Sequence, residues 1–273
     1  MTRLRLDSYL ARIGVRGPLR ADLASVAALH AAHVNAIPFE GGDPLLRRPV
    51  RLDLDSVQAK LVDDRRGGYC FEQNTLFKAV LEAIGCKVTG LGGRVRWMSP
   101  PDSPLGPREH MLLKVDLPEG AFLADVGFGA CLLDMPLRLE SGLEQRTGMG
   151  TFRLTEADGY YWLAARQPGG WRTMYAFTLE PQIASDFELG NWYTSTSPLT
   201  PFTSMLIMER LAPGARYKLI DRTFITEGRD GAVTSQTDLD SAEAFAGVLD
   251  EVFNVTLPVP AGELFQRLGT RDR

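Results

Sequence analysis

Cysteine and histidine are scarce in this chain, with only three of each among 273 residues. The cysteines, at positions 70, 86 and 131, form neither a CxxC pair nor an even set. This pattern argues against a disulfide framework and against the common zinc motifs. His30 and His33 lie three residues apart in an alanine-rich segment, but no further ligand follows at a recognisable spacing. We therefore interpret both as ordinary helix histidines and Cys86 and Cys131 as structural cysteines, and we expect no bound metal.

The chain also lacks long apolar runs and a strong excess of charge of either sign. No stretch is apolar over the length needed to span a bilayer, and the segment MTRLRLDSYLARIG lacks the apolar core of a signal peptide. The formal net charge is −4 and the sequence pI is about 5.5, which argues against nucleic acid or an anionic membrane as the main partner. With its unpaired cysteines, the sequence predicts a cytoplasmic protein in a reducing environment and leaves the oligomeric state open.

Hydrophobic periodicity divides the chain into three regions. Up to about residue 85, apolar residues recur at helical spacing, as in LRADLASVAALHAAHVNAI. From about residue 87 to 180, short alternating segments are separated by the turn sequences PEG, ADG and PGG, which indicates a barrel or a strongly curled antiparallel sheet. The remainder combines a predicted loop, GNWYTSTSPLTPF, with strands and with a helix whose N-cap is Ser241. The fold class is therefore α+β.

The segment RRGGYCFEQN, residues 65–74, places Cys70 shortly after a pair of glycines. The apolar residues at 77, 80, 81 and 84 have helical spacing, and counting back by sevens from 84 puts Cys70 on the same face, in the first turn. The free N–H groups and partial positive charge of a helix N-terminus favour a thiolate over a thiol. A buried structural cysteine is the alternative, and the position alone leaves both interpretations open.

A cysteine nucleophile usually needs a base and a group that orients the base. His110 opens the predicted strand HMLLKVDL directly after the loop SPPDSPLGPRE, and catalytic side chains are often found beside loops. The sequence HMLLKVDLPEGAFLADVGFG predicts a hairpin. If Leu117 pairs with Gly120, His110 and Asp125 lie on the same sheet face, one diagonal step apart. Because an aspartate between apolar neighbours needs a buried partner, we predict a triad of Cys70, His110 and Asp125.

Four segments of the chain, HVNAIPFE, RRGGYCFEQN, ADVGFG and NWYTSTSP, resemble the arylamine N-acetyltransferase family. The resemblance implies a helical bundle at 1–86 that carries the nucleophile, an antiparallel β-barrel at 87–184 and an α/β lid at 185–273, with a cysteine-protease-like triad. It also implies transfer of an acetyl group from acetyl-CoA to arylamines, arylhydrazines or hydrazides, and a role in xenobiotic metabolism. The triad of that family corresponds to Cys70, His110 and Asp125 of this chain.

Two further groups of residues are assigned to the substrates. The resemblance places the acceptor against Phe39 in IPFE and Phe128 in VGFG, and we add Val95 to this pocket. For CoA we predict contacts from Gly106 and Arg108 of the proline-rich loop, where Arg108 supplies positive charge, and from Thr196 in NWYTSTSP.

The chain departs from the family after Glu40, where Gly41-Gly42 stands in place of the usual Asn-Leu. This change affects the hydrogen bonding and rigidity expected of the loop. Arg66 precedes Cys70 by one helical turn, and we predict that it pairs with Glu40 through a fork–carboxylate contact. Such a pair would tie the Phe39 loop to the start of the nucleophile helix.

Three other classes of protein fit parts of the same pattern. A cysteine protease or a transglutaminase-like enzyme would use the same three residues, in an open cleft for a polypeptide. An amide synthase that closes macrolactams from carrier-bound chains is a relative of the acetyltransferases and would keep the triad without CoA contacts. A small-molecule binding protein could retain remnants of a triad, but the three intact residues argue against it.

Overall fold

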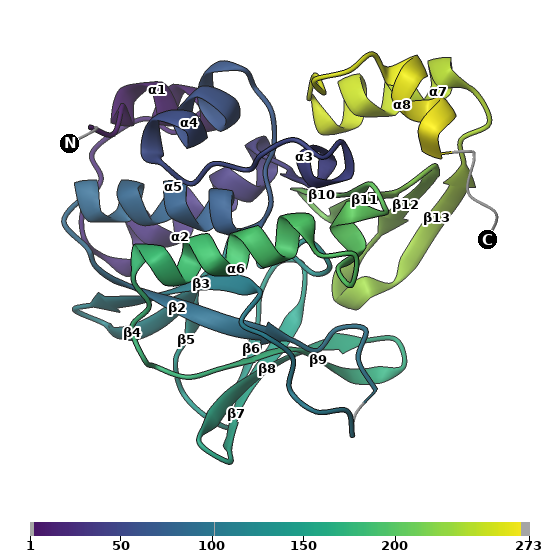
Figure 1. Cartoon of the computed structure of the whole chain (residues 1–273). Helices are drawn as coiled ribbons and strands as arrows, with labels where there is room; N and C mark the ends of the chain where they lie inside the picture. Colours follow the sequence, from purple (N-terminus) through teal and green to yellow (C-terminus); the bar gives the residue numbers. More distant parts are fainter. Residues whose placement is uncertain (1–2, 101, 269–273) are drawn as a thin grey trace.

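The computed structural model describes residues 3–100 and 102–268 (Figure 1). Its N-terminal part is helical, and the helix starts follow from local capping. The Asp22 carboxylate accepts the Ser25 N–H at 2.9 Å, and Asp53 accepts the Ser56 N–H at 3.0 Å. The helices of this part are α1 (Leu6–Ile13), α2 (Leu23–Ala36), α3 (Gly42–Leu45), α4 (Leu54–Gln58) with a π-helical turn (Ala59–Asp63), and α5 (Cys70–Ala83).

The central strands form one antiparallel sheet of eight strands in the order β5-β4-β3-β2-β9-β8-β7-β6. The Gln145 side chain joins its two edges, because its Oε1 accepts the Arg138 N–H at 2.7 Å and its Nε2 donates to the Arg138 carbonyl at 2.9 Å. The sheet is therefore a barrel in which a side chain bridges the seam, and the prediction of a barrel is confirmed. The strands are β2 (Lys87–Val95), β3 (His110–Leu117), β4 (Gly120–Ala124), β5 (Leu137–Arg138), β6 (Glu144–Arg146), β7 (Thr151–Ala157), β8 (Tyr160–Gln167) and β9 (Gly170–Phe177).

A second antiparallel sheet has five strands in the order β1-β10-β11-β12-β13. Its first strand comes from the helical N-terminal part, so two distant segments of the chain share this sheet. Ser241 caps the following helix as predicted, since its hydroxyl accepts the Ala244 N–H. The elements are β1 (Phe39–Glu40), β10 (Ile207–Ala212), β11 (Ala215–Ile220), β12 (Thr223–Glu227), β13 (Val233–Asp238), α7 (Ala242–Gly247), a π-helical turn (Val248–Phe253) and α8 (Ala261–Leu268), with short 3₁₀ turns at Pro201–Thr203 and Arg229–Gly231.

Helix α6 (Ala184–Thr196) corrects one prediction, because residues 190–196 were expected to form a loop. Asn, Trp, Tyr, Thr and Ser are weak helix formers, so the local sequence conceals this helix. Contacts with distant segments hold it in place. The Asn191 amide donates to the Val50 carbonyl at 2.9 Å, and the Tyr69 hydroxyl donates to the Asn191 carbonyl at 3.2 Å. In Figure 1, α6 runs across the front of the molecule between α5 and the barrel.

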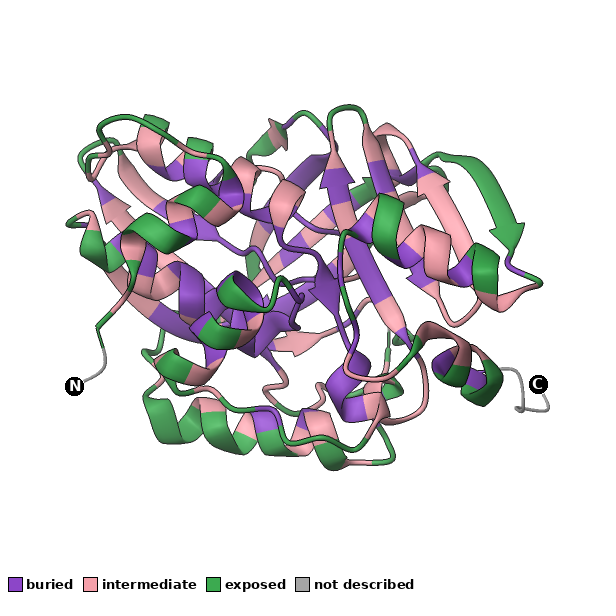
Figure 2. Cartoon of the chain, turned by 90° about the horizontal axis from the view of Figure 1, so that it is seen from above, coloured by how far each residue is buried: buried purple, intermediate pink, exposed green. Residues whose placement is uncertain are grey.

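The apolar residues within 3–100 and 102–268 form three cores. One lies where the N-terminal helices pack on β3 and β4, one fills the barrel, and one lies between the five-stranded sheet and the C-terminal helices. Buried segments meet at the centre of the molecule, whereas β13 is exposed along its whole length (Figure 2). None of the described helices is both long enough and apolar enough to cross a bilayer.

Candidate active site

Cys70 occupies the first position of α5, as predicted. The Glu72 carboxylate accepts the Tyr69 N–H at 3.1 Å and so satisfies one of the free donors at the helix start. The helix ends before Gly85, whose φ of 93° is accessible mainly to glycine. Cys70 is only 4% exposed, and its thiol donates to the Glu109 carbonyl at 3.8 Å. The nucleophile candidate therefore lies at a helix N-terminus and faces the strand that carries His110.

The hairpin has the predicted register. Leu117 pairs with Gly120, and Leu113 pairs with Ala124. Asp125 follows the last pair, and the His110 Nε2–H donates to its Oδ2 at 2.7 Å. Both side chains are buried, with 2% and 0% exposed surface. The predicted proximity of His110 and Asp125 is thus present, and the two residues lie next to Cys70.

Asp125 has two further side-chain partners that the sequence analysis missed. The Tyr175 hydroxyl donates to Oδ2 at 2.8 Å, and the Asn74 amide donates to Oδ1 at 3.0 Å. Oδ1 also accepts the Gly127 N–H at 2.9 Å, while the Asp125 N–H donates to His30 Nε2 at 3.3 Å. Asn74 could have been found, because it lies four residues after Cys70 on the same helix face. Tyr175 is on β9, and no local signal connects it to Asp125.

Burial and charge have opposite effects on the two ionisable groups of this cluster. Burial opposes a charged imidazole, but the Asp125 carboxylate and hydrogen bonds with Asp125 and Cys70 outweigh burial and raise the pKa of His110 to about 10. Burial likewise opposes a charged carboxylate, but the positive charge and hydrogen bond of His110 lower the pKa of Asp125 below its ordinary value. The arrangement therefore favours an imidazolium that is held by a carboxylate and lies beside the Cys70 sulfur.

The predicted contact between Arg66 and Glu40 is confirmed. Arg66 Nη2 donates to both Glu40 carboxylate oxygens at 3.0 and 2.9 Å, and its Nη1 donates to both Asp43 oxygens at 2.9 and 3.1 Å. Lys60, which the sequence analysis missed together with Asp43, lies 2.7 Å from Asp43 and 2.7 Å from Glu72. A buried chain of charges therefore connects β1 to the residue that caps the nucleophile helix.

The glycines after Glu40 fit this network closely. The Gly42 N–H donates to Glu40 Oε1 at 2.7 Å, and a Cβ on Gly42 would lie 2.3 Å from the same oxygen. A Cβ on Gly41 would lie 3.0 Å from the Phe202 ring. Gly42 therefore allows Glu40 to fold back on its own loop, and Gly41 allows Phe202 to approach it.

The predicted acceptor residues lie around this cluster. The Phe128 ring meets the His110 ring edge-on, with 5.2 Å between centroids. Phe39 packs against Gly129, where a Cβ would lie 2.2 Å from the ring, and Phe202 lies 5.9 Å from Phe39. Val95 is paired with Tyr175 on β9 and packs against the core that contains Phe128. Phe202 could not be predicted from the sequence, because its position depends on contacts between distant segments.

The residues predicted to contact CoA make other contacts. The Gly106 carbonyl accepts a hydrogen bond from Arg94, and Arg108 pairs with Glu180 at 2.6 Å. The Thr196 hydroxyl donates to the carbonyl of Trp192 within α6 at 2.6 Å. Thr194, one half-turn earlier, is closer to the cluster, since its hydroxyl donates to the same Glu109 carbonyl that accepts from the Cys70 thiol, at 3.5 Å.

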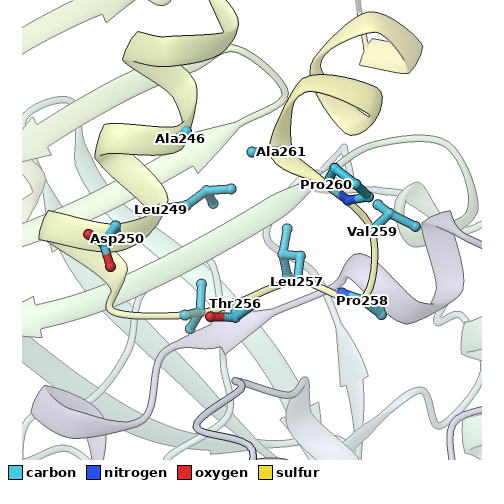
Figure 3. Close-up of a pocket in the computed structure, with 10 residues that line it drawn as sticks. Ala246, Leu249, Asp250, Thr256, Leu257, Pro258, Val259, Pro260 and Ala261 are labelled. Carbon is cyan, nitrogen blue, oxygen red and sulfur yellow. The ribbon is translucent and has the colours of Figure 1, made fainter.

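Two hollows lie outside the buried cluster. One of about 440 Å³ lies between the helical segment ending at Phe253 and the segment leading to α8, with Leu249 and Leu257 on its walls (Figure 3). It contains none of the predicted site residues. A second hollow of about 520 Å³ is lined by Arg96, Trp97, Trp162, Trp171 and Arg172, among others. The Trp97 ring lies 6.1 Å from that of Phe128, so this hollow borders the aromatic wall beside His110.

Comparison with known proteins assigns the chain to a family. The family model for N-acetyltransferases matches residues 22–261. The arylamine N-acetyltransferase of Mycolicibacterium smegmatis is 44% identical over 252 residues, which cover 91% of this chain and 90% of the relative. The Escherichia coli K12 arylamine N-acetyltransferase is 38% identical, over 92% of this chain and 88% of the relative.

Solved structures agree with these matches. The M. smegmatis arylamine N-acetyltransferase superposes with a TM-score of 0.92 at 40% identity and covers 98% of this chain and 100% of its own. The Mycobacterium marinum arylamine N-acetyltransferase, solved in complex with CoA, has a TM-score of 0.91 at 35% identity, with 96% of this chain and 98% of its own covered. The chain therefore belongs to the arylamine N-acetyltransferase family of enzymes.

Proposed function

We propose that this enzyme transfers an acetyl group from acetyl-CoA to arylamines, arylhydrazines or hydrazides through an acetyl-Cys70 intermediate. The observation that carries the proposal is the hydrogen bond of 2.7 Å between His110 and Asp125, beside a cysteine at a helix N-terminus. Family membership supports the choice of acceptors, and the CoA complex of the M. marinum relative supports the choice of donor.

In the first half-reaction, the Cys70 sulfur attacks the acetyl carbonyl of acetyl-CoA. A bond forms between this sulfur and the acetyl carbon, and the bond from that carbon to the CoA sulfur breaks. CoA leaves as a thiol by taking a proton from the His110 imidazolium, while Asp125 keeps the ring oriented. One thioester replaces another, so the step is close to balanced in free energy.

In the second half-reaction, the amine nitrogen attacks acetyl-Cys70. The carbon–sulfur bond breaks, the amide forms, and His110 assists by accepting the proton lost from the amine. Arylamines and arylhydrazines suit this step because their conjugate acids are weak and the neutral nucleophile dominates at pH 7. Lysine-like alkylamines have pKa values near 10.4 and are mostly protonated, so we expect them to be poor acceptors. Phe39 and Phe128 hold the aryl ring by aromatic contacts in this proposal.

For CoA, we propose that its phosphates contact the surface formed by Gly106, Arg108 and Thr196. Arg108 is already paired with Glu180, so a phosphate would share or replace that carboxylate. Arg172, in the hollow beside Trp97, is the competing cation. The two surfaces are distinguished by comparing Arg108→Gln with Arg172→Gln. The proposal expects a raised KM for acetyl-CoA in the first variant only, and the reverse pattern would move the phosphates to the hollow.

The proposed mechanism is tested by mass spectrometry and initial rates. Incubation with acetyl-CoA alone should add one acetyl group to Cys70, and the adduct should hydrolyse slowly in water. Initial rates with varied acetyl-CoA and arylamine should give the parallel reciprocal plots of a ping-pong mechanism. Intersecting plots would indicate direct transfer in a ternary complex and would contradict an acetyl-enzyme route.

Cleavage of an aryl acetate, measured with and without an added arylamine, separates the alternative enzymes. A cysteine protease would cleave polypeptides and would not need CoA, while an amide synthase would use carrier-bound thioesters and ignore acetyl-CoA. Stimulation of aryl acetate cleavage by an added arylamine supports a transferase. Cleavage at an unchanged rate, with no acetylated amine formed, would point to a hydrolase.

A further inference from the structure

Glu209 on β10 and Arg216 on β11 form a completely buried ion pair, with 0% and 1% exposed surface. Arg216 Nε lies 3.0 Å from Glu209 Oε1, and Arg216 Nη1 lies 3.4 Å from Glu227 Oε2. Within the described residues, Glu209 Oε2 has no hydrogen-bond partner. Burying two charges with one carboxylate oxygen unsatisfied is weak evidence for a gain in stability. We therefore ask which parts of the backbone the Glu209–Arg216 pair holds in place.

The pair holds both backbone polar groups of Leu132. The Leu132 N–H donates to Glu209 Oε1 at 2.8 Å, and Arg216 Nη2 donates to the Leu132 carbonyl at 3.1 Å. Leu132 directly follows a tight turn that starts at Phe128, whose carbonyl accepts the N–H groups of residues 130 and 131 at 2.8 and 3.0 Å. The turn that carries Phe128 is thus anchored to the five-stranded sheet at its far end.

The backbone of Glu209 also locates the second aromatic wall. Glu209 is the ladder partner of Phe39 in the β1–β10 pairing. The Phe39 ring in turn lies so close to Gly129 that a Cβ there would be 2.2 Å from a ring carbon. The main chain of Glu209 therefore holds Phe39 in place, and the side chain of Glu209 holds the Phe128 turn.

We propose that the Glu209–Arg216 pair is a positioning device that sets the separation of Phe39 and Phe128 and thereby the fit of aromatic acceptors. The inference rests on the proposed function, in which these two rings hold the aryl group. It goes beyond that function by assigning acceptor selectivity to residues of the C-terminal sheet. The pair acts on capture of the acceptor and not on the attack of Cys70 on acetyl-CoA.

The test uses two acceptors with the same nucleophilic group, phenylhydrazine and hydrazine, of which only the first has a ring. The double variant Glu209→Leu/Arg216→Leu removes both charges, so that neither is left buried and unpaired. We expect its KM for phenylhydrazine to rise about tenfold or more, because small displacements of positioning groups have large effects. The kcat/KM for hydrazine and the rate of Cys70 acetylation should stay within about twofold of the wild type.

Two single variants keep the test decisive if the double variant folds poorly. Glu209→Gln keeps the side-chain volume and an oxygen for the Leu132 N–H but weakens the attraction to Arg216, so the same selective effect should be smaller. Glu227→Gln is the matched control, because Glu227 contacts Arg216 and not Leu132, and its KM for phenylhydrazine should be unchanged.

Equal losses with both acceptors would show that the pair is only structural and would overturn the inference. An unchanged KM for phenylhydrazine in folded variants would do the same. A different result would refute the proposed function itself: the wild type would then form no acetyl-Cys70 on incubation with acetyl-CoA. If Phe39→Leu and Phe128→Leu left the KM for phenylhydrazine unchanged, the proposed contact between these two rings and the aryl group of the acceptor would be refuted.

Discussion

Asp125 is the residue on which most of the buried site depends, since its carboxylate accepts hydrogen bonds from His110, Tyr175, Asn74 and the Gly127 N–H. Asparagine at this position has similar shape but offers one oxygen and an NH₂ group to the same donors. We expect Asp125→Asn to lower kcat/KM by about 10³- to 10⁴-fold, because His110 loses its orientation and the charge that stabilises its imidazolium. The free energy of unfolding, measured by urea denaturation, should fall by about 3 kcal/mol.

The control for this prediction is Tyr175→Phe. It removes one donor from Asp125 and leaves the contact with His110 intact, so we expect a loss of about 1–3 kcal/mol in stability and of less than about tenfold in rate. A folded Asp125→Asn variant with near-normal activity would show that Asp125 has no catalytic role.

The three cysteines should differ sharply in reactivity. Burial raises the pKa of the Cys86 and Cys131 thiols, so both stay protonated at neutral pH. Cys70 lies at a helix N-terminus beside His110, and iodoacetamide should therefore label it first, with loss of activity that follows the extent of labelling. Peptide mapping after partial alkylation checks this prediction. Labelled enzyme that still turns over would contradict the role of Cys70 as nucleophile.

At the scale of elements, the buried charges around Arg66 connect β1, α3 and the start of α5. Arg66→Gln would leave the Glu40 and Asp43 carboxylates without their bidentate partner. Among the residues that the structure describes, Asp43 would keep only Lys60 and the half-exposed Arg48 as cationic partners. We expect the free energy of unfolding to fall by about 3–5 kcal/mol, with a lower soluble yield. Chemistry in the protein that remains folded should change less. Acetyl-Cys70 formation per folded molecule and urea denaturation measure the two effects separately.

A matched exposed pair provides the control for Arg66. Lys78 and Glu82 lie one turn apart on α5 and are 33% and 46% exposed, so Lys78→Gln should change stability by no more than about 0.5 kcal/mol. Comparable losses of unfolding free energy in Arg66→Gln and Lys78→Gln would mean that the buried network stabilises the protein no more than an exposed ion pair does.

The site shows which parts of a structure a sequence can predict. The Cys70 helix start and the hairpin register depend on neighbouring residues, and both were predicted correctly. The contact between Arg66 and Glu40 could be predicted because both residues belong to recognisable motifs. In contrast, Tyr175 reaches Asp125, and Glu209 reaches the Leu132 N–H, from strands placed by pairing between distant segments, and α6 depends on contacts with Val50 and Tyr69. Periodicity and capping carry no information about such contacts.

The whole molecule assembles the site from all three regions of the chain. Cys70 comes from the helical region, and His110 and Asp125 come from the barrel. The five-stranded sheet, which β1 completes from the N-terminal side, anchors the segment after Phe128 through Glu209. This sharing of β1 couples the region 1–86 to the region 185–273, and the contacts of Leu132 with Glu209 and Arg216 couple the barrel region to the latter. Their standing as separate domains stays a prediction, as do the cytoplasmic setting, the role in xenobiotic metabolism and the oligomeric state.

The three histidines predict how the stability of the whole protein depends on pH. Burial lowers the pKa of His30 to about 3 and that of His33 to about 4. His33 is fixed as a neutral ring between the Tyr9 hydroxyl at 2.9 Å and Gln73 Oε1 at 2.7 Å. With an ordinary pKa of 6.5 in the unfolded chain, both histidines bind protons more readily there than in the folded protein between pH 6.5 and about 4. Stability should therefore fall as the pH falls through this range.

His110 changes the stability with pH in the opposite direction, because its pKa of about 10 in the folded protein lies above the ordinary value of 6.5 in the unfolded chain. Its contribution is complete below pH 6.5 and is lost as the pH rises towards 10. Urea denaturation between pH 4.5 and 10 should give a stability maximum near pH 6.5. For His33, the interval from 6.5 to about 4 corresponds to about 3 kcal/mol, so His33→Gln should flatten the acid limb and His110→Gln the alkaline limb. If the His33→Gln curve ran parallel to the wild type below pH 6.5, His33 would have the same pKa in both states and its burial as a neutral ring would be refuted.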